Sequence, residues 1–215
     1  MADNTNRYGF RWRKSINGAG QPKPIRYRLA SGLQPTAGGT NVDFHVGDPV
    51  KILSTGYADM AVGSEGTQTA IYGIAVGFSP EYDGVTMQPR NKHTGGQGAY
   101  GTNYERENYV WVVPAEGQIF EVDCDDNTTA TTYAAYLAFI GENADMVLSA
   151  DTTNSNDPKA NPKLDISSHA TTSTLQWRIL DIGQTLENAD FSGNYVKLLV
   201  TINKTAQAPF QTTGT

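Results

Sequence analysis

Asp123, Asp125 and Asn127 have the spacing that begins a calcium-binding loop, and they are the sequence's best candidate for a metal site. Oxygen ligands at alternate positions suit Ca²⁺, which prefers carboxylates and carbonyls. The continuation does not fit, because Thr128 stands where the loop needs its turn glycine and Ala134 where it needs a bidentate glutamate. We therefore interpret the segment as an acidic turn and expect no bound metal.

The other residues capable of chemistry do not form a catalytic pattern. His45, His93 and His169 lie in separate segments without the spacing of zinc ligands. Cys124 is the only cysteine, and its acidic neighbours would raise the pKa of the thiol, whereas a nucleophile needs it lowered. Residues 96–101, GQGAYG, match G-x-G-x-x-G but lack the flanking strand and helix of a nucleotide site. We expect no catalytic residue, no cofactor and no enzymatic activity.

Residues 7–28, RYGFRWRKSINGAGQPKPIRYR, concentrate basic and aromatic side chains at the front of an acidic chain. Seven basic residues against the single acid Asp3 give the first 35 residues a charge of +6. Because the whole chain carries −6, the remainder carries −12. The charge is therefore sorted by position along the chain.

Three interpretations of this segment are open: a strap that docks on another protein, a solvated disordered tail, or an arm that binds single-stranded nucleic acid. Arg and Lys bind phosphates and aromatic rings stack on bases, but the acidic remainder would repel a polyanion. We favour the protein strap, with Phe10, Trp12 and Tyr27 filling pockets and arginines pairing with carboxylates, and expect no nucleic-acid partner. The candidate partner-binding residues are Arg7, Phe10, Arg11, Trp12, Arg13, Lys14, Arg26, Tyr27 and Arg28.

The rest of the sequence predicts an all-β fold, with a β-barrel or β-sandwich core. Short runs rich in β-branched and aromatic residues are separated by turn-forming residues, and no strand–helix alternation occurs. In residues 134–149 a helix ending at Gly141 competes with a strand, and we favour the strand. The PAEG segment, residues 114–117, predicts a hairpin turn. The other expected strands lie within 43–55, 69–78, 109–113, 118–124, 173–185 and 194–203.

The expected organisation is a single β-rich domain with two appendages. Residues 1–40 form an extended basic and aromatic arm, because glycine and proline recur there without a strand or helix period. The domain covers residues 41–205 and contains long loops at 79–108 and 149–163. Residues 206–215 form a polar tail. No segment has the apolar length of a membrane span or the pattern of a secretory signal, so we expect no membrane partner and synthesis in a cytoplasm.

A series of six motifs within about residues 42–204 is similar, in its order, to a known family of proteins. In order they are VGDPVKI, IYGIAVG, YVWVVPAEGQIFEVDCDD, GENADMV, LDISSHATTSTLQWRILDIGQ and NYVKLLVTIN. This order resembles the head decoration, or cement, proteins of tailed bacteriophages. The resemblance implies a non-enzymatic β-rich virion protein that binds the outer capsid surface as a trimer or dimer. There it would bridge major capsid protein subunits. From the composition of the arm we expect residues 1 to about 35 to be disordered in the free chain and ordered on the capsid.

Two other functions are open from the sequence. A virion carbohydrate-binding or tail- or neck-associated module would stack sugar rings on Trp111, Tyr100, Tyr104 or Trp177. Trp111 and Trp177 lie in expected strands, so packing in the core is favoured for both. A depolymerase-like enzyme would depend only on acid pairs such as Glu105 and Glu107, and it is the weakest alternative.

Overall fold

The computed structural model describes most of the chain between residues 9 and 203. The described residues are 9–20, 22–29, 44–61, 70–82, 87–88, 91–93, 109–125, 129–148, 162–184, 188, 191 and 195–203.

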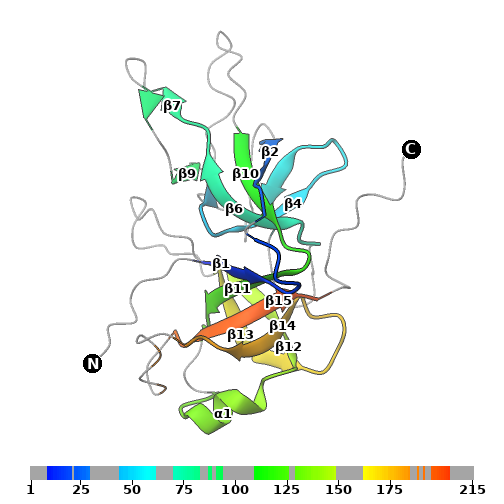
Figure 1. Cartoon of the computed structure of the whole chain (residues 1–215), viewed down its shortest axis with the longest axis vertical. Helices are drawn as coiled ribbons and strands as arrows, with labels where there is room; N and C mark the ends of the chain where they lie inside the picture. Colours follow the sequence, from blue (N-terminus) through cyan, green and yellow to red (C-terminus); the bar gives the residue numbers. More distant parts are fainter. Residues whose placement is uncertain are drawn as a thin grey trace.

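Two antiparallel sheets form the molecule, one above the other in Figure 1. The six-stranded sheet has the order β1-β11-β15-β14-β12-β13 and the five-stranded sheet the order β2-β10-β6-β4-β5. The six-stranded sheet comprises β1 (Arg11–Ser15), β11 (Gln118–Asp123), β12 (Asn143–Leu148), β13 (Pro162–Ala170), β14 (Trp177–Ile182) and β15 (Lys197–Ile202). The five-stranded sheet comprises β2 (Ile25–Arg28), β4 (Pro49–Ile52), β5 (Ala58–Met60), β6 (Gly73–Phe78) and β10 (Tyr109–Pro114).

Two short two-stranded ladders and one helix complete the described elements. The ladders are β3 (Phe44–His45) with β9 (Lys92–His93), and β7 (Glu81–Tyr82) with β8 (Met87–Gln88). The helix is α1 (Tyr133–Ala138), at the lower end of Figure 1. The all-β prediction is therefore confirmed. The strands β7, β8 and β9 fall within residues 79–108, which we expected to be a loop.

Each sheet curls so that its far strands approach one another, without closing a barrel. In the six-stranded sheet an isolated parallel bridge joins Cys124, just after β11, to Leu164 in β13. In the five-stranded sheet a similar bridge joins Leu29, just after β2, to Ala58 in β5. Single bridges are not continuous ladders, so the fold is sandwich-like. The larger core cluster lies in the six-stranded sheet and reaches Ile74 and Val113 of the other.

The N-terminal segment differs from the expected arm, because it supplies one strand to each sheet. β1 pairs with β11 and β2 pairs with β10, both antiparallel. The strand pattern is hidden in the sequence because most side chains of β1 and β2 are exposed and a bulge interrupts β1 between Trp12 and Lys14. Residues 11–15 and 25–28 are therefore strands of the two sheets, where we expected an extended arm.

The PAEG turn connects the two sheets and does not form the predicted hairpin. β10 ends at Pro114 in the five-stranded sheet and β11 begins at Gln118 in the six-stranded one. Gly117 has φ +67°, a conformation that favours glycine, and the Gln118 amide donates to the Ala115 carbonyl at 3.2 Å. The hairpin partners of β10 and β11 are replaced by β2 and β1. The segment β1–β2 thus pairs with the segment β10–β11 in both sheets, β1 with β11 and β2 with β10.

Residues 134–149, for which we considered a helix or a strand and favoured the strand, contain a helix followed by a strand. Residues 133–138 form α1, whose N-cap Thr132 accepts a hydrogen bond from the Ala135 amide, and β12 follows at 143–148. Gly141 has φ +92° and lies between them, so the glycine stop belongs to the helical alternative. Alanine-rich residues 134–138 favour the helix and the β-branched and apolar residues after Gly141 favour the strand.

Phe10 is expected to be a stability residue of the free protein. Its ring is 2% exposed and stacks on Trp177 at a centroid distance of 4.2 Å. Phe10→Ala should lower the free energy of unfolding by about 3–5 kcal/mol, because it removes buried area and leaves a cavity. Urea unfolding followed by tryptophan fluorescence measures this. The control Ile16→Ala, at a side chain 58% exposed, should change stability by under about 0.5 kcal/mol. Equal midpoints for both variants would contradict the placement of Phe10.

Candidate functional site

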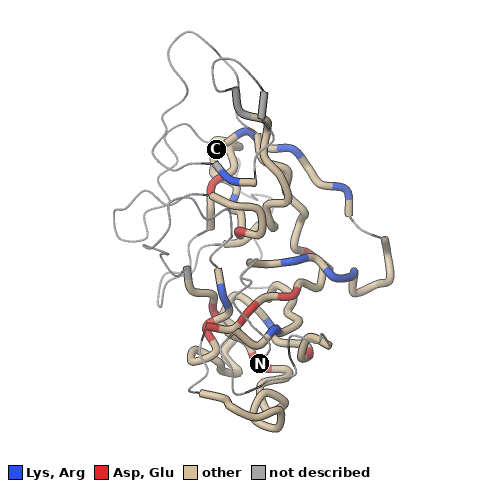
Figure 2. The backbone as a smooth tube through the Cα atoms, turned by 90° about the vertical axis from the view of Figure 1, so that its left-hand side faces the viewer, with Lys and Arg blue, Asp and Glu red and all other residues tan. Residues whose placement is uncertain are grey.

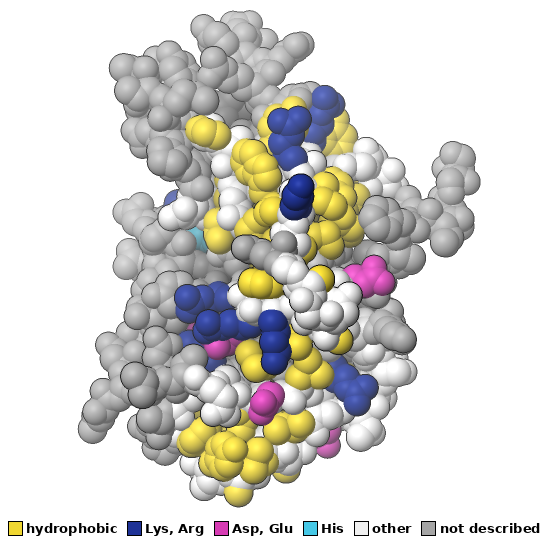
Figure 3. Space-filling view, viewed as in Figure 1, with side chains coloured by type: hydrophobic (Ala, Val, Ile, Leu, Met, Phe, Trp, Pro, Cys, Tyr) yellow, Lys and Arg dark blue, Asp and Glu magenta, His cyan; other side chains and the backbone are white. Residues whose placement is uncertain are grey.

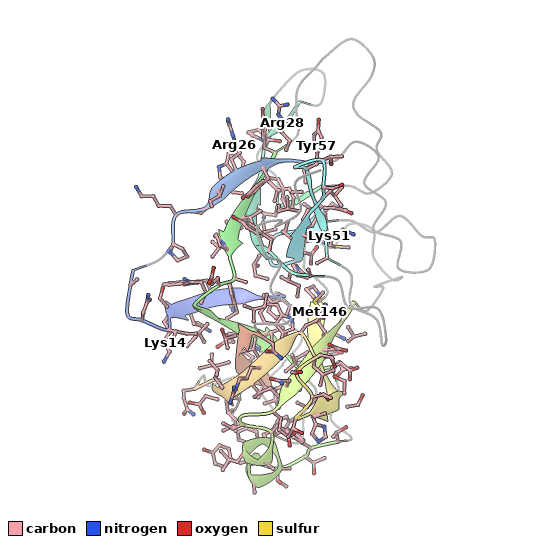
Figure 4. The ribbon with its side chains drawn as sticks, turned by 90° about the vertical axis from the view of Figure 1, so that its right-hand side faces the viewer. Lys14, Arg26, Arg28, Lys51, Tyr57 and Met146 are labelled. Carbon is pink, nitrogen blue, oxygen red and sulfur yellow. The ribbon has the colours of Figure 1, made fainter. Side chains whose placement is uncertain are left out.

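The candidate site is the basic segment, defined as residues 9–20 and 22–29. It contains six basic residues and no acid, and all six basic side chains are exposed. Figure 2 shows them along one side of the molecule, and Figure 4 places Lys14 at the six-stranded sheet and Arg26 and Arg28 at the five-stranded sheet. In Figure 3 basic side chains lie over both sheets with apolar side chains among them. The segment thus presents a positive surface that extends over both halves of the fold.

The aromatic residues of the segment are used within the chain. Phe10 is buried against Trp177, so its predicted role of filling a pocket on a partner is wrong. Trp12 is half-buried, and its indole Nε1 donates to Gln118 Oε1 at 2.8 Å. Sequence reasoning assigned both rings to a partner because it could not know that β11 and β14 would supply their neighbours.

Tyr27 is also held by the fold, through a second tyrosine. Its hydroxyl oxygen lies 2.7 Å from that of Tyr72, and the rings meet edge to face. Burial, followed by the hydrogen bond to Tyr27, raises the pKa of Tyr72 well above its usual value. Tyr72 therefore stays neutral across the physiological range, and its hydrogen bond with Tyr27 attaches β2 to the residue just before β6.

Two of the basic side chains have partners that fix their direction. Arg13 pairs through Nη2 with Oε1 of Glu121, whose side chain is 3% exposed. The guanidinium of Arg26 lies over the ring of Tyr109, 4.5 Å from its centroid. The exposed Lys14 and Lys23 are compact, flexible charges. Arg7 lies outside the described residues.

The exposed apolar side chains of the segment are Ile16 and Ile25, which the sequence analysis did not select. Ile16 is 58% exposed and Ile25 is 41% exposed. Sequence reasoning selected the aromatic residues instead, because Trp and Tyr are the usual hot-spot residues. Only the fold shows that the larger rings face inward while the two isoleucines remain in solvent.

The acidic turn has a structural role. Asp123 forms an ion pair with Lys197, Oδ1 to Nζ 3.3 Å, and both side chains are buried. The Asp125 carboxylate accepts a hydrogen bond from the Ile166 amide at 3.1 Å and so ties β13 to the end of β11. Asn127 lies outside the described residues. Within the described part of the chain, no cluster of three His, Cys, Asp or Glu residues could hold a metal ion.

The remaining residues considered for chemistry are placed as follows. Trp177 is fully buried, so it cannot stack on a sugar, while Trp111 is half-buried in β10. His45 is buried and lies 3.8 Å from Asp48, and His169 is half-buried, 3.8 Å from Glu142. The side chain of His93 and the residues GQGAYG, Tyr100, Tyr104, Glu105 and Glu107 lie outside the described residues.

Arg13 should matter to the fold more than its exposure suggests. Arg13→Ala leaves the buried Glu121 carboxylate without its cation, and we expect a loss of about 1–3 kcal/mol in the free energy of unfolding. Lys14→Ala, the matched control at the next position, should cost under about 0.5 kcal/mol. Chemical denaturation of both variants measures the difference. Equal stabilities of the two variants would show that the ion pair of Arg13 contributes nothing measurable to stability, which is true of many exposed ion pairs.

Cys124 should be unreactive in the native protein. Burial raises the pKa of its thiol to about 11, the acids Asp125 and Asp123 adding a smaller effect in the same direction. Because the unfolded thiol ionises near its ordinary pKa of 9.0 and the folded one does not, folding stability should fall as pH rises from 9 towards 11. Cys124→Ala should remove this part of the pH dependence, measured as the difference from the parent chain in urea unfolding. Rapid modification of the native thiol at pH 8 would contradict the assignment.

No protein-family model matches the chain, and neither a curated protein nor a solved structure matches it. Among the described residues, no helix is long and apolar enough to cross a membrane. The function proposed below therefore depends on the geometry and charge of the basic segment and on the resemblance noted in the sequence.

Proposed function

We propose that the chain is a non-enzymatic virion structural protein, a head decoration protein of a tailed bacteriophage. It binds the outer capsid surface and bridges neighbouring major capsid protein subunits, together with other copies of itself. The resemblance of residues 42–204 suggests this class, and the placement of the basic segment supports a docking role. The alternative is a structural module of the tail or neck that docks through the same segment.

The observation that carries the proposal is that the basic segment is held to both sheets while its six basic residues remain exposed. β1 is hydrogen-bonded to β11 in one sheet, and β2 is hydrogen-bonded to β10 in the other. A flexible arm would lose conformational entropy when it docks, at a cost of about 1–2 kcal/mol for each ordered residue. A surface already held in place avoids most of that cost, so more of its contact energy contributes to binding.

The charge distribution favours a protein partner with an acidic surface. The basic segment carries six positive charges and no negative one, whereas the chain as a whole carries −6. Such a separation orients the protein, since an acidic partner attracts this side and repels the others. A capsid surface repeats the same site many times, so an oriented protein can bind every copy in one manner.

Binding of this kind stabilises a shell by mass action. A protein that binds only the assembled shell lowers the free energy of that state, by an amount that grows with its free concentration over its Kd. Where one copy contacts two neighbouring subunits, it also opposes their separation. No covalent step is needed for either effect.

The carbohydrate alternative is weakened by the structure. Stacking on a sugar ring requires an exposed aromatic face, and Trp177 is 0% exposed. Of the rings considered for this role, the described residues leave only the half-buried Trp111. We therefore do not carry this alternative further.

Sedimentation with isolated capsid shells tests the proposal. The parent chain should pellet with expanded shells of its phage and saturate at a fixed ratio to the major capsid protein. The double variant Lys14→Glu, Lys23→Glu should bind about tenfold or more weakly, because it reverses two exposed charges of the basic segment. The control Arg178→Glu changes an exposed charge on β14, outside the segment, and should bind like the parent.

Two results would contradict the proposal. Absence of saturable binding to shells would remove the decoration role. Equal binding by the double variant and the control would show that the basic segment is not the docking surface. Tight binding to isolated tails in place of heads would support the tail or neck alternative.

A further inference from the structure

Two large apolar side chains are exposed within the basic segment, although larger ones in the same segment are buried. Ile16 follows β1 and is 58% exposed, the highest value among the large hydrophobic residues that the structure describes. Ile25 begins β2 and is 41% exposed. Phe10 and Leu29, at the two ends of the segment, are 2% and 7% exposed. The fold thus buries the ends of the segment and leaves these two isoleucines in solvent.

We propose that Ile16 and Ile25 are the apolar anchors of a docking site whose occupant is an acidic protein segment with apolar side chains of its own. The inference deepens the proposed function by naming the chemistry of the partner at the same surface. Ile16 lies two residues from Lys14, and Ile25 is flanked within two residues by Lys23 and Arg26. Each isoleucine therefore has exposed basic residues close to it in the chain. A protein interface combines an apolar centre with a polar rim, and these residue types can supply both.

Charge complementarity selects the occupant. With six exposed cations and no acid in the described segment, the site favours carboxylates and repels another basic surface. Pairing of two copies through the β1 edge would place Arg11, Arg13 and Lys14 against the same residues. Basic side chains and a bulge on an edge strand are features that prevent such pairing, and β1 has both. A second copy bound in this manner is therefore disfavoured.

The aromatic side chains separate a protein partner from single-stranded nucleic acid. Base stacking needs accessible aromatic rings. Phe10 is buried, and Trp12 is half-buried with its indole hydrogen-bonded to Gln118. Tyr27 is half-buried and hydrogen-bonded to Tyr72. The exposed apolar groups are aliphatic, and burying an isoleucine against apolar atoms contributes about 1.5–3 kcal/mol when the burial is complete. Phosphates alone would leave both isoleucines without a contact.

Other exposed apolar groups lie on and next to α1, at the lower end of Figure 1, and provide a control. Tyr133, Leu137 and Ile140, on and just after α1, are 48%, 42% and 38% exposed, and Figure 3 shows apolar side chains at this lower end. α1 has no acidic residue in its first turn and no basic residue in its last. This patch lacks the positive charges found near Ile16 and Ile25, and the nearest charged residue in the chain to Ile140 is the acid Glu142. Ile140 matches Ile25 in residue type and nearly in exposure.

The test compares the double variant Ile16→Thr, Ile25→Thr with the control Ile140→Thr. Threonine keeps the β-branched shape that suits a strand while removing apolar surface. Thermal unfolding should show both variants folded like the parent. The probes are a fluorescent peptide rich in Glu and Leu, the same peptide with Ser replacing Leu, and an oligothymidine of equal charge, measured by fluorescence anisotropy.

The parent and the control should bind the Glu/Leu peptide at least about tenfold more tightly than the Glu/Ser peptide or the oligothymidine. The double variant should lose this preference and bind the two peptides equally. Three results would overturn the inference: equal binding of both peptides by the parent, no binding of any probe, or preferred binding of the oligothymidine with a steep salt dependence.

The same variants on capsid shells separate this inference from the proposed function. If shells bind the parent and the double variant equally, the isoleucines are not anchors, but the decoration role stands. If the Glu/Leu preference depends on the isoleucines while no shell binds the parent, the site stands and the decoration role fails. Loss of shell binding in the double variant alone supports both.

Discussion

The packing of Phe10 on Trp177 is the contact on which the arrangement of the chain depends. It brings the start of the basic segment into the core of the six-stranded sheet, where Phe120 also meets Trp177 edge to face at 6.1 Å. With Phe10 held there, β1 lies along β11. The chain then continues to β2 in the five-stranded sheet, the upper one in Figure 1, where β2 pairs with β10. One buried ring thus fixes a segment that contributes a strand to each sheet.

The basic segment is held in place because it pairs with the segment β10–β11 in both sheets. β10 and β11 are joined by three residues around Gly117, and β1 and β2 follow the same path in the opposite direction. Backbone hydrogen bonds hold the basic segment in place. Only some of its side chains therefore need to pack against the fold. Arg13 turns towards Glu121, while Lys14 and Lys23 face solvent. One side of the segment therefore contributes to the stability of the fold, and the other side remains in solvent, where we propose that a partner binds.

The sequence predicts those parts of the fold where the pattern of apolar residues matches the strand period. The strands β6, β10, β14 and β15 fall in runs that alternate or are buried on both faces, and they agree with the expected ranges. The sequence does not predict β1 and β2, because their exposed arginines and lysines resemble those of a solvated tail. It does not predict β13, because the residues of this strand are mostly small, polar or charged. Each of these strands forms because it pairs with a neighbour that is distant in sequence: β1 with β11, β2 with β10 and β13 with β12. A local sequence pattern holds no information about such a neighbour.

The candidate site is predictable in place but not in detail, and the difference has a physical cause. Charge is visible in the sequence, so the order of residues alone is enough to select the basic segment. Burial is decided by tertiary contacts, and it reverses the expected roles: Phe10 stabilises the fold, while Ile16 and Ile25 are the exposed apolar groups. Since only groups that remain in solvent can contribute new burial on association, the isoleucines are the apolar groups of the segment from which binding energy can come. The strap inferred from the sequence therefore ties the chain's own two sheets together, and its outer side is what remains for a partner.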